Sequence, residues 1–406
     1  MAPNAPRDGR QMSITIGIVA GEASGDALAA TMIDACRRRL PGVRFAGIAG
    51  PRMEAAGCEV WAPMERLAVR GLTEVLAHLP KLVRMRWRLR RRLLAARIPL
   101  FVGVDAPDFN LGLEAKLRRR GVRTIHFVSP SVWAWRRERL ATIGRSANRM
   151  LALFPFEKPL YEAAGIPVTY VGHPMAARAA TDTTRRQTRE LLKIKGATPV
   201  FALLPGSRHA EVEMHAELLL NTAALLLEAR PDALFLVPFA TRSTRDVFAA
   251  AAERLGRDAL PMTLLYGHAE DALRAADVGV IASGTATLEA ALARCPHVVF
   301  YRVAALTARI VRAKLLLPYV GLPNILAGRF VVPELLQDEA TPENLAQVTL
   351  NLFDDTVTRR RLETLFAGFA LILAADTATL AADAVAQELA HARAPLRSGS
   401  GRVGRA

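Results

Sequence analysis

Short apolar runs alternate with longer helical patterns along this chain, and the alternation starts afresh half-way. The runs of the first half lie at 13–20, 43–50, 99–105, 123–129, 149–156 and 167–174. Those of the second half lie at 199–208, 233–240, 262–267, 277–284 and 294–302. Strands that alternate with helices form parallel sheets, because the chain must cross over between neighbouring strands. We therefore predict an α/β fold with two Rossmann-like, doubly wound domains that face each other across a central cleft.

Length and composition agree with two domains. The chain has 406 residues, of which 51% are apolar and 23% are charged, enough to fill two cores. We expect an N-terminal domain over 13–175, a C-terminal domain over 198–390 and a disordered, basic tail over 391–406. The three cysteines are scattered and no CxxC motif occurs, so we expect neither a disulfide nor a zinc site.

The charge balance predicts an anionic partner. Lys and Arg number 54 and Asp and Glu 38, which gives a formal net charge of +16. Such a surplus attracts nucleic acid, phosphorylated small molecules or an acidic membrane face. No secretory signal is recognisable at the start, and no uninterrupted apolar run approaches the ~18 residues of a spanning helix. We expect a protein that is soluble or bound to a membrane surface.

Polar residues stand where two strands of the first series end, and open parallel sheets bind ligands at that edge. Glu22 and Ser24 lie in the turn "AGEASGD" (20–26), beside a helix start that favours anions. Asp105 follows an apolar strand directly, where a carboxylate can act as a general base toward a hydroxyl. A capped turn, with Ser24 or Asp26 bonding the helix amides, and a solvated strand end are the alternatives.

The turn "LLPGSRHAEVEM" (203–214) opens the second series as "AGEASGD" opens the first. Gly206 and Ser207 free backbone amides at a helix start, and Arg208 adds a permanently charged fork of donors. This combination is typical of a diphosphate site, although an ordinary turn between strand and helix remains the alternative.

A second nest is predicted in "IASGTATLEAAL" (281–292). Ser283, Gly284 and Thr285 can bind an anion through their backbone amides. Glu289 lies one helical turn later, where a carboxylate can accept both hydroxyls of a ribose. A Ser/Thr helix cap with a solvated Glu289 is the alternative, and Asn324 in "GLPNILAGR" (321–329) says little by itself.

Basic and aromatic residues gather in two segments of the first half. The segment "KLVRMRWRLRRRLLAAR" (81–97) has eight Lys and Arg and no acid, and as a helix it can lie on an anionic bilayer. The residues expected to meet lipid there are Leu82, Met85, Trp87, Arg88, Leu89 and Arg91. The alternative is a helix that packs its apolar stripe on the sheet. In "SPSVWAWRRERL" (129–140), Trp133 and Trp135 can stack bases, lie at a membrane interface or pack under a loop.

Taken together, the motifs resemble one family, the lipid-A-disaccharide synthases. They occur in the family's order between residues ~14 and ~330, and the joint match is far more specific than any single motif. The motifs are "GEASGD", "GPRMEAAGCE", "VGVDAPDFN", "HFVSPSVWAWR", "LFPFEK", "YVGHP", "LLPGSRHAEV", "ASGTATLE" and "LPNILAGR".

The resemblance implies an inverting glycosyltransferase of the GT-B arrangement. It would join UDP-2,3-diacylglucosamine to 2,3-diacylglucosamine 1-phosphate and form the β(1→6)-linked lipid A disaccharide 1-phosphate and UDP. The N-terminal domain would bind the lipid acceptor and the C-terminal domain the UDP-sugar. The enzyme would sit peripherally on the cytoplasmic face of the inner membrane, with an anionic membrane surface as partner. It would need no cofactor, metal or nucleic acid, and a homodimer is one option for its assembly.

The resemblance also implies roles for individual residues. Asp105 matches the family's essential aspartate and would be the general base, and Arg208 matches its essential arginine. Glu22 and Ser24 match loop residues near the reacting centre. The positions implied for UDP are Gly206, Ser207, Arg208, Ser283, Gly284, Thr285, Glu289 and Asn324.

Three other functions are compatible with parts of the pattern. A UDP-sugar epimerase can have the same two-domain plan, but the additional acids that elimination needs are not evident as a set. The charge and the Trp/Arg segment also suit an RNA-binding protein. The basic helix suits a membrane-bound scaffold.

Overall fold

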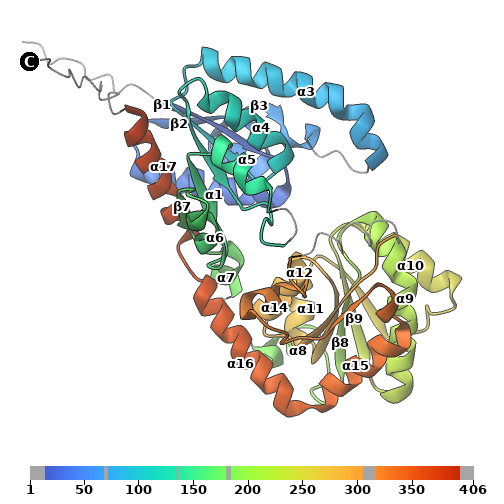
Figure 1. Ribbon diagram of the computed structural model, residues 1–406. Coiled ribbons are helices and arrows are strands. Elements are labelled where there is room, and N and C mark those ends of the chain that lie inside the picture. Colours follow the sequence, from blue (N-terminus) through green and yellow to red (C-terminus); the bar gives the residue numbers. More distant parts are fainter. Residues whose placement is uncertain (1–13, 68–71, 135–136, 180–183, 305–315, 394–406) are drawn as a thin grey trace, which may run out of the picture. The chain divides into compact units, whose positions relative to one another are not determined.

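The computed structural model describes residues 14–67, 72–134, 137–179, 184–304 and 316–393 (Figure 1). Trp135 and Arg136 of the aromatic segment lie outside these ranges, as does the expected tail from residue 394 onward. The chain divides into two compact units. The first holds the described parts of Met1–Val132, Arg137–Pro174 and Ala375–Ala406, and the second holds Trp133–Arg136 and Met175–Ala374.

The described strands of the first unit form one parallel sheet in the order β3-β2-β1-β4-β5-β6-β7. The strands are β1 (Ile14–Ala20), β2 (Val43–Ala49), β3 (Cys58–Pro63), β4 (Leu100–Val104), β5 (Arg123–Phe127), β6 (Arg149–Ala152) and β7 (Val168–Tyr170). The helices of this unit are α1 (Ala23–Arg39), α2 (Pro51–Ala55), α3 (Leu72–Ala95), α4 (Pro107–Arg118), α5 (Arg139–Ser146), α6 (Glu157–Ala163) and α17 (Thr377–Arg393). The edge strand β3 and the short helix α2 are additions to the predicted series.

The second unit repeats this plan with the order β10-β9-β8-β11-β12-β13. Its strands are β8 (Val200–Leu204), β9 (Leu234–Phe239), β10 (Met262–Tyr266), β11 (Val278–Ala282), β12 (His297–Tyr301) and β13 (Glu334–Leu336). The helices between the first sheet and α17 are α7 (Pro174–Ala179), α8 (Arg185–Leu191), α9 (His209–Ala229), α10 (Arg242–Arg254), α11 (Ala269–Ala275), α12 (Thr285–Leu292), α14 (Leu322–Ala327), α15 (Pro342–Asp354) and α16 (Thr356–Leu373). The edge strand β13 was not predicted.

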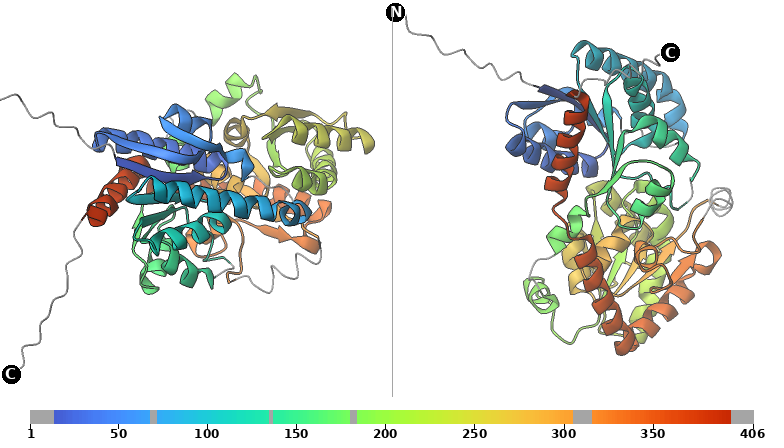
Figure 2. Two further views of the ribbon diagram at one scale, coloured as in Figure 1. Left: turned by 90° about the horizontal axis from the view of Figure 1, so that it is seen from above. Right: turned by 60° about the vertical axis from the view of Figure 1, so that its left-hand side comes forward.

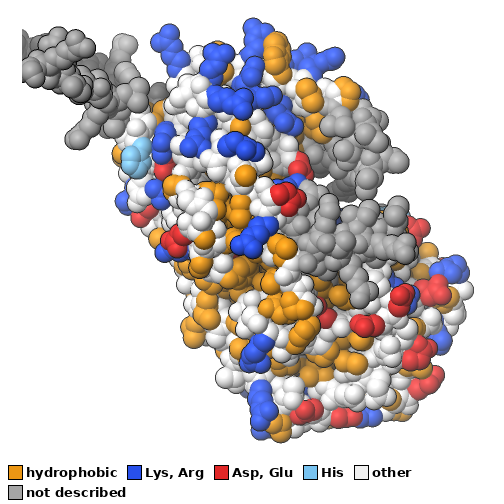
Figure 3. Space-filling view, viewed as in Figure 1, with side chains coloured by type: hydrophobic (Ala, Val, Ile, Leu, Met, Phe, Trp, Pro, Cys, Tyr) orange, Lys and Arg blue, Asp and Glu red, His pale blue; other side chains and the backbone are white. Residues whose placement is uncertain are grey.

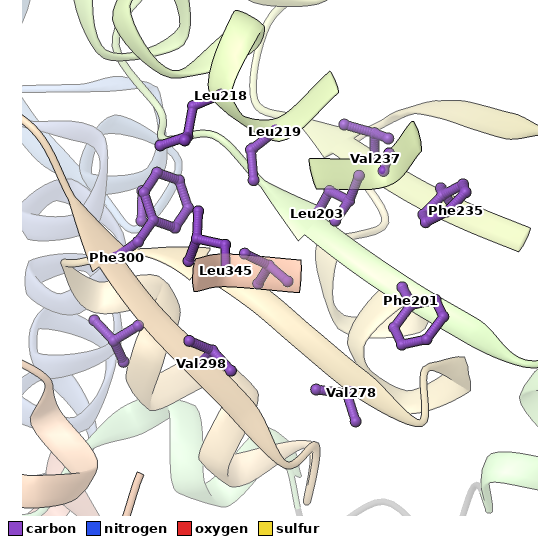
Figure 4. Close-up of a cluster of buried hydrophobic side chains, with 14 of the residues drawn as sticks. Phe201, Leu203, Leu218, Leu219, Phe235, Val237, Val278, Val298, Phe300 and Leu345 are labelled. Carbon is purple, nitrogen blue, oxygen red and sulfur yellow. The ribbon is translucent and has the colours of Figure 1, made fainter. Parts of the chain in front are cut away.

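Each sheet is buried on both faces, because successive side chains of a strand point to opposite sides. In β8, Phe201 and Leu203 join the core under α9, α10 and α15, part of which is drawn in Figure 4. Val200, Ala202 and Leu204 point the other way, into the core under α11 and α12. The near-continuous apolar composition of these runs follows from this double burial.

Helix α17 returns the end of the chain to the first unit and packs on α1 (Figures 1 and 2). The boundary expected at 390 is therefore wrong, since residues 375–390 belong to the first unit. The expected tail also begins too early, because α17 continues to Arg393. The helical periodicity of this segment indicates a helix, but it carries no information about which sheet the helix covers.

One segment, Thr356–Arg393, is long and apolar enough to cross a membrane by length and composition. It comprises α16 and α17, which are assigned to different units. Leu362, Phe366 and Phe369 of α16 lie in the second core, and Val385 and Leu389 of α17 lie in the first. Core packing explains these side chains, whereas Leu371 and Ile372 at the end of α16 are 78% and 55% exposed.

Candidate active site

In both units, the polar turns follow the two strands between which the strand order reverses. In the first sheet the order β3-β2-β1 runs one way and β4-β5-β6 the other, so that β1 lies beside β4. In the second sheet β8 lies beside β11 in the same way. Because the connections from these neighbouring strands leave in opposite directions, a crevice opens at their carboxyl ends, where open α/β sheets bind ligands. Four of the turns selected from the sequence lie at these two points.

Asp105 occupies a constrained turn between β4 and α4. Its φ is +52° and that of Ala106 is +44°, a region that few residues other than glycine adopt. The Asp105 amide donates to the Phe127 carbonyl at 2.8 Å, and the Asn110 Nδ2 donates to the Asp105 carbonyl at 2.8 Å. The backbone is thus held from both sides, while the half-buried carboxylate has no hydrogen bond or ion pair to any described residue. This leaves the carboxylate available to a ligand.

The turn after β1 lies directly beside Asp105. A Cβ on Gly21 would stand 2.6 Å from the Ala106 Cβ, so only glycine permits this approach of the two turns. Glu22 precedes α1 and Ser24 lies in its first turn, and both side chains are exposed. The structure therefore brings Glu22, Ser24 and Asp105 to one edge of one sheet, as the motif positions predicted.

Asp26 does not cap α1, which was the alternative raised for this turn. Its buried carboxylate accepts from the amides of Gly50 and Arg52 at 3.0 Å and of Met53 at 3.1 Å. These amides are the free donors at the start of α2, whereas α1 has no side-chain cap. Asp26 thus fixes the Gly21–Asp26 turn by binding a neighbouring helix.

A buried polar pair beside Gly103 of β4 was not predicted from the sequence. Glu114 and His126 are both fully buried, with 2.7 Å between the Glu114 Oε1 and the His126 Nδ1. Burial raises the pKa of Glu114, and the adjacent imidazole opposes this. A Cβ on Gly103 would lie 2.1 Å from Glu114 Oε1, so this glycine gives the carboxylate its space. Glu114 lies on α4 and His126 on β5. The hydrophobic periodicity of the sequence predicts the helix and the strand, but not that these two side chains meet.

In the second unit, the turn after β8 presents the expected donors. Gly206 has φ +119°, which a side chain would strain, and Arg208 precedes the first residue of α9. Ser207 is exposed, and the Arg208 side chain is 76% exposed. Glu211 was not predicted as a site residue. Its carboxylate accepts hydrogen bonds from the amides of Ser207 and Arg208 and pairs with the Arg208 Nη1 at 2.9 Å.

The turn after β11 places the predicted residues before a helix start, but the Ser283 amide is not free, because it donates to the Phe300 carbonyl at 2.9 Å. Gly284 precedes α12 with φ +152°, and Thr285 begins the helix; both are exposed and Ser283 is half-buried. The Thr287 hydroxyl donates to the Gly284 carbonyl at 2.8 Å and fixes the turn. Glu289 is half-buried one turn later on the same helix.

Asn324 requires a correction. It is fully buried, and its Nδ2 donates to the Val332 carbonyl at 3.0 Å and to Glu334 at 2.7 Å. Its Oδ1 accepts from the amides of Val331 and Val332 at 2.6 and 2.9 Å. Both donors and both acceptor sites of the amide are therefore occupied. Asn324 holds the loop together and is not available to hold a nucleotide in this arrangement.

A family model described as lipid-A-disaccharide synthetase matches residues 16–374 of the chain. The lipid-A-disaccharide synthase of Chromobacterium violaceum is 53% identical over 376 residues, which cover 93% of this chain and 97% of that protein. The chain belongs to the lipid-A-disaccharide synthetase family. The resemblance inferred from the motifs is thus confirmed, and the match runs through both units.

Solved structures similar to this family member show its fold. The Glycotransferase of kitacinnamycin has a TM-score of 0.60 at 18% identity and covers 95% of this chain and 100% of its own. A putative UDP-N-acetylglucosamine 2-epimerase from Listeria monocytogenes has a TM-score of 0.59 at 13% identity, with 92% and 95% covered. The predicted two-domain, Rossmann-like GT-B fold is confirmed. Since transferases and epimerases share it, the fold does not choose between these activities, whereas the family match favours the transferase.

The basic helix α3 divides into a buried and an exposed face. Leu89 is 6% exposed and joins the core with Leu93, and Met85 packs against them. The expectation that Leu89 meets lipid is therefore wrong, because its stripe packs on the sheet. Trp87 is 49% exposed, Arg88 and Arg91 are exposed, and the Arg91 guanidinium lies 4.7 Å from the centre of the Trp87 ring. Figure 3 shows Lys and Arg side chains gathered over this part of the first unit.

Among the described residues, no group of three or more His, Cys, Asp or Glu side chains could hold a metal ion. The three cysteines are free and buried. Burial raises the pKa of each thiol to about 12, so none of them is activated as a nucleophile.

Proposed function

We propose that this protein is an inverting glycosyltransferase that joins UDP-2,3-diacylglucosamine to 2,3-diacylglucosamine 1-phosphate. Its products are the β(1→6)-linked lipid A disaccharide 1-phosphate and UDP. The observation that carries the proposal is the family match, which spans residues 16–374 and so includes both polar sites. The donors and the carboxylate at these sites suit the chemistry of the transfer.

Asp105 acts as the general base in this proposal. Transfer requires that the 6-hydroxyl of the acceptor lose a proton as it attacks the anomeric carbon. The Asp105 carboxylate lies at a ligand-binding edge, its backbone is fixed by Phe127 and Asn110, and no described residue pairs with it. Exposed Ser24 and Glu22 line the same edge and contact the acceptor sugar.

The second unit binds the UDP part of the donor. Negative charge develops on the diphosphate as the glycosidic bond breaks, and fixed cations and amides stabilise it. Arg208 and the Ser207 amide supply such donors after β8, and the Gly284–Thr285 nest supplies amides after β11. The Glu289 carboxylate accepts hydrogen bonds from the ribose hydroxyls. Attack from the face opposite UDP inverts the anomeric carbon in one displacement.

Both substrates carry acyl chains, so the proposed enzyme works at a membrane. The exposed Trp87, Arg88 and Arg91 of α3 suit an anionic bilayer surface. We place the protein on the cytoplasmic face of the inner membrane as a peripheral enzyme, where a nucleotide sugar is available.

The proposal is tested by incubating the protein with both acylated glucosamines and measuring UDP release and disaccharide formation. We expect both products in equal amounts, and only when both substrates are present. UDP-sugar that is consumed or epimerised without the acceptor would indicate the epimerase reaction. Absence of disaccharide with both substrates in detergent micelles, using protein shown to be folded, would refute the proposal.

A further inference from the structure

The proposed diphosphate site already contains an anion that belongs to the protein. The Glu211 Oε2 accepts from the Ser207 amide at 3.1 Å and from the Arg208 amide at 3.2 Å. The Glu211 Oε1 pairs with the Arg208 Nη1 at 2.9 Å and accepts from the Tyr301 hydroxyl at 3.4 Å. Two amides, a guanidinium and a hydroxyl therefore converge on one carboxylate.

These contacts exceed what helix capping needs. A glutamate at the third position of a helix commonly accepts from the residue that precedes the helix, and Glu211 does so with Arg208. It also accepts hydrogen bonds from the Ser207 amide and the Arg208 guanidinium, and these donors suit a diphosphate. Gly206 permits this arrangement, because a Cβ there would lie 2.8 Å from the Glu211 Oε2. The turn is thus shaped around an oxygen anion.

The same donors cannot bind Glu211 and a diphosphate at once. We infer that Glu211 is an internal competitor of the nucleotide, which occupies the Ser207–Arg208 donors until UDP-sugar displaces it and returns to them as UDP leaves. This inference rests on the proposed function, since it assigns the donors to UDP. It makes Glu211 a positioning residue that acts through Arg208.

Nucleotide binds only those molecules in which the donors are free. The apparent affinity is therefore the intrinsic affinity multiplied by the fraction of such molecules. Because the carboxylate is attached to the same helix, it returns without diffusion and favours the departure of UDP. The Tyr301 hydroxyl adds a contact of 3.4 Å to the carboxylate while it occupies the donors. Burial, followed by the charge of Glu211, raises the pKa of Tyr301, so its hydroxyl remains a donor at neutral pH.

The test compares nucleotide binding by the full chain and by Glu211→Gln in calorimetry. Glutamine can still accept from the amides and preserve the turn, but it lacks the charge that holds Arg208. We expect the affinity for UDP to rise several-fold and that for uridine, which has no phosphate, to stay unchanged. The KM for the UDP-sugar should fall, and kcat should fall with it if UDP release limits turnover.

Glu213→Gln is the matched control. Glu213 is exposed on the same helix, and its carboxylate lies 3.9 Å from the Nδ1 of His209, so removing this charge should leave UDP affinity within twofold of wild type. Glu211→Asp is a second variant that keeps the charge and the helix start. Its carboxylate is one methylene shorter and cannot reach both amides and Arg208, so we expect tighter UDP binding here too.

UDP binding that is weakened or unchanged in both folded variants would overturn the inference, because Glu211 would then only support Arg208. Failure of the wild-type protein to bind UDP at all is a different result. It would refute the proposed function and is read from the wild-type measurement alone.

Discussion

Arg123 at the start of β5 and Glu388 on α17 form an ion pair although 265 positions separate them in the chain. The Arg123 Nε donates to the Glu388 Oε2 at 2.8 Å, and the Arg149 Nε donates to the Oε1 at 2.9 Å. Glu388 is 2% exposed, so its charge is compensated by two guanidinium groups from adjacent strands. This contact joins the end of the chain to the first sheet.

Replacing Glu388 by Gln should destabilise the first unit. Two arginines would lose their partner in a mostly buried setting, at a cost of about 2 kcal/mol. This lies below the range for fully buried pairs, because the Arg123 side chain is 31% exposed. Denaturant unfolding checks the change. Asp383→Asn on the same helix is the control, since its pair with Arg39 is more exposed and should contribute under about 1 kcal/mol. Equal effects of the two substitutions would contradict the role given to Glu388.

Replacing Asp105 by Asn should abolish most of the turnover while UDP binding stays intact. Asparagine tolerates the positive φ of this turn, so the fold should persist. Loss of a general base lowers kcat by about 10²–10⁴-fold. Asp108→Asn is the control, because that exposed carboxylate pairs with Arg139 at 2.6 Å. Steady-state rates and calorimetric UDP affinity measure the outcome, and undiminished kcat in Asp105→Asn would remove the residue from its proposed role.

Replacing Arg208 by Lys should weaken UDP binding and transfer together. Lysine keeps the charge but loses the planar fork that binds two phosphate oxygens. We expect roughly tenfold weaker UDP binding and a larger loss of kcat/KM. Arg254→Lys is a control, since Arg254 is exposed on α10 and pairs with Glu217 at 3.5 Å. Wild-type affinity for UDP in Arg208→Lys would show that the nucleotide binds elsewhere.

The positions of Asp105 and Arg208 could be predicted because local signals determine them. An apolar run that ends in Asp105 predicts a strand and its carboxyl end, and β4 ends at Val104 as expected. The Gly-Ser-Arg turn likewise lies between β8 and α9. The alternation of strands and helices predicts doubly wound sheets with ligand sites at the carboxyl ends of the strands. It does not predict which strands are neighbours, and the structure shows that these turns lie where the order reverses.

Partners that are distant in sequence could not be predicted from periodicity. Asp26 lies at a position typical of a helix cap, but it binds the amides of α2. Asn324 lies in a motif expected to hold the nucleotide, yet Glu334 and the Val331–Val332 backbone occupy its amide. Leu89 lies on an amphipathic helix, and its apolar stripe gives no sign whether a sheet or a bilayer covers it. In each case tertiary contacts decide, and the pattern leaves them open.

Buried His297 should make the stability of the second unit depend on pH. Burial lowers the pKa of His297 from 6.5 to about 4, partly opposed by its bond to the Cys295 carbonyl. Between these values the unfolded chain binds a proton that the folded chain does not, so stability falls as the pH falls from about 6.5 to 4. The loss attributable to His297 is about 3 kcal/mol. Denaturant unfolding at pH 7 and pH 4.5 should show a smaller acid loss for His297→Gln than for wild type. His209→Gln, at an exposed position, should behave like wild type, and an equal acid loss in all three proteins would contradict the assignment.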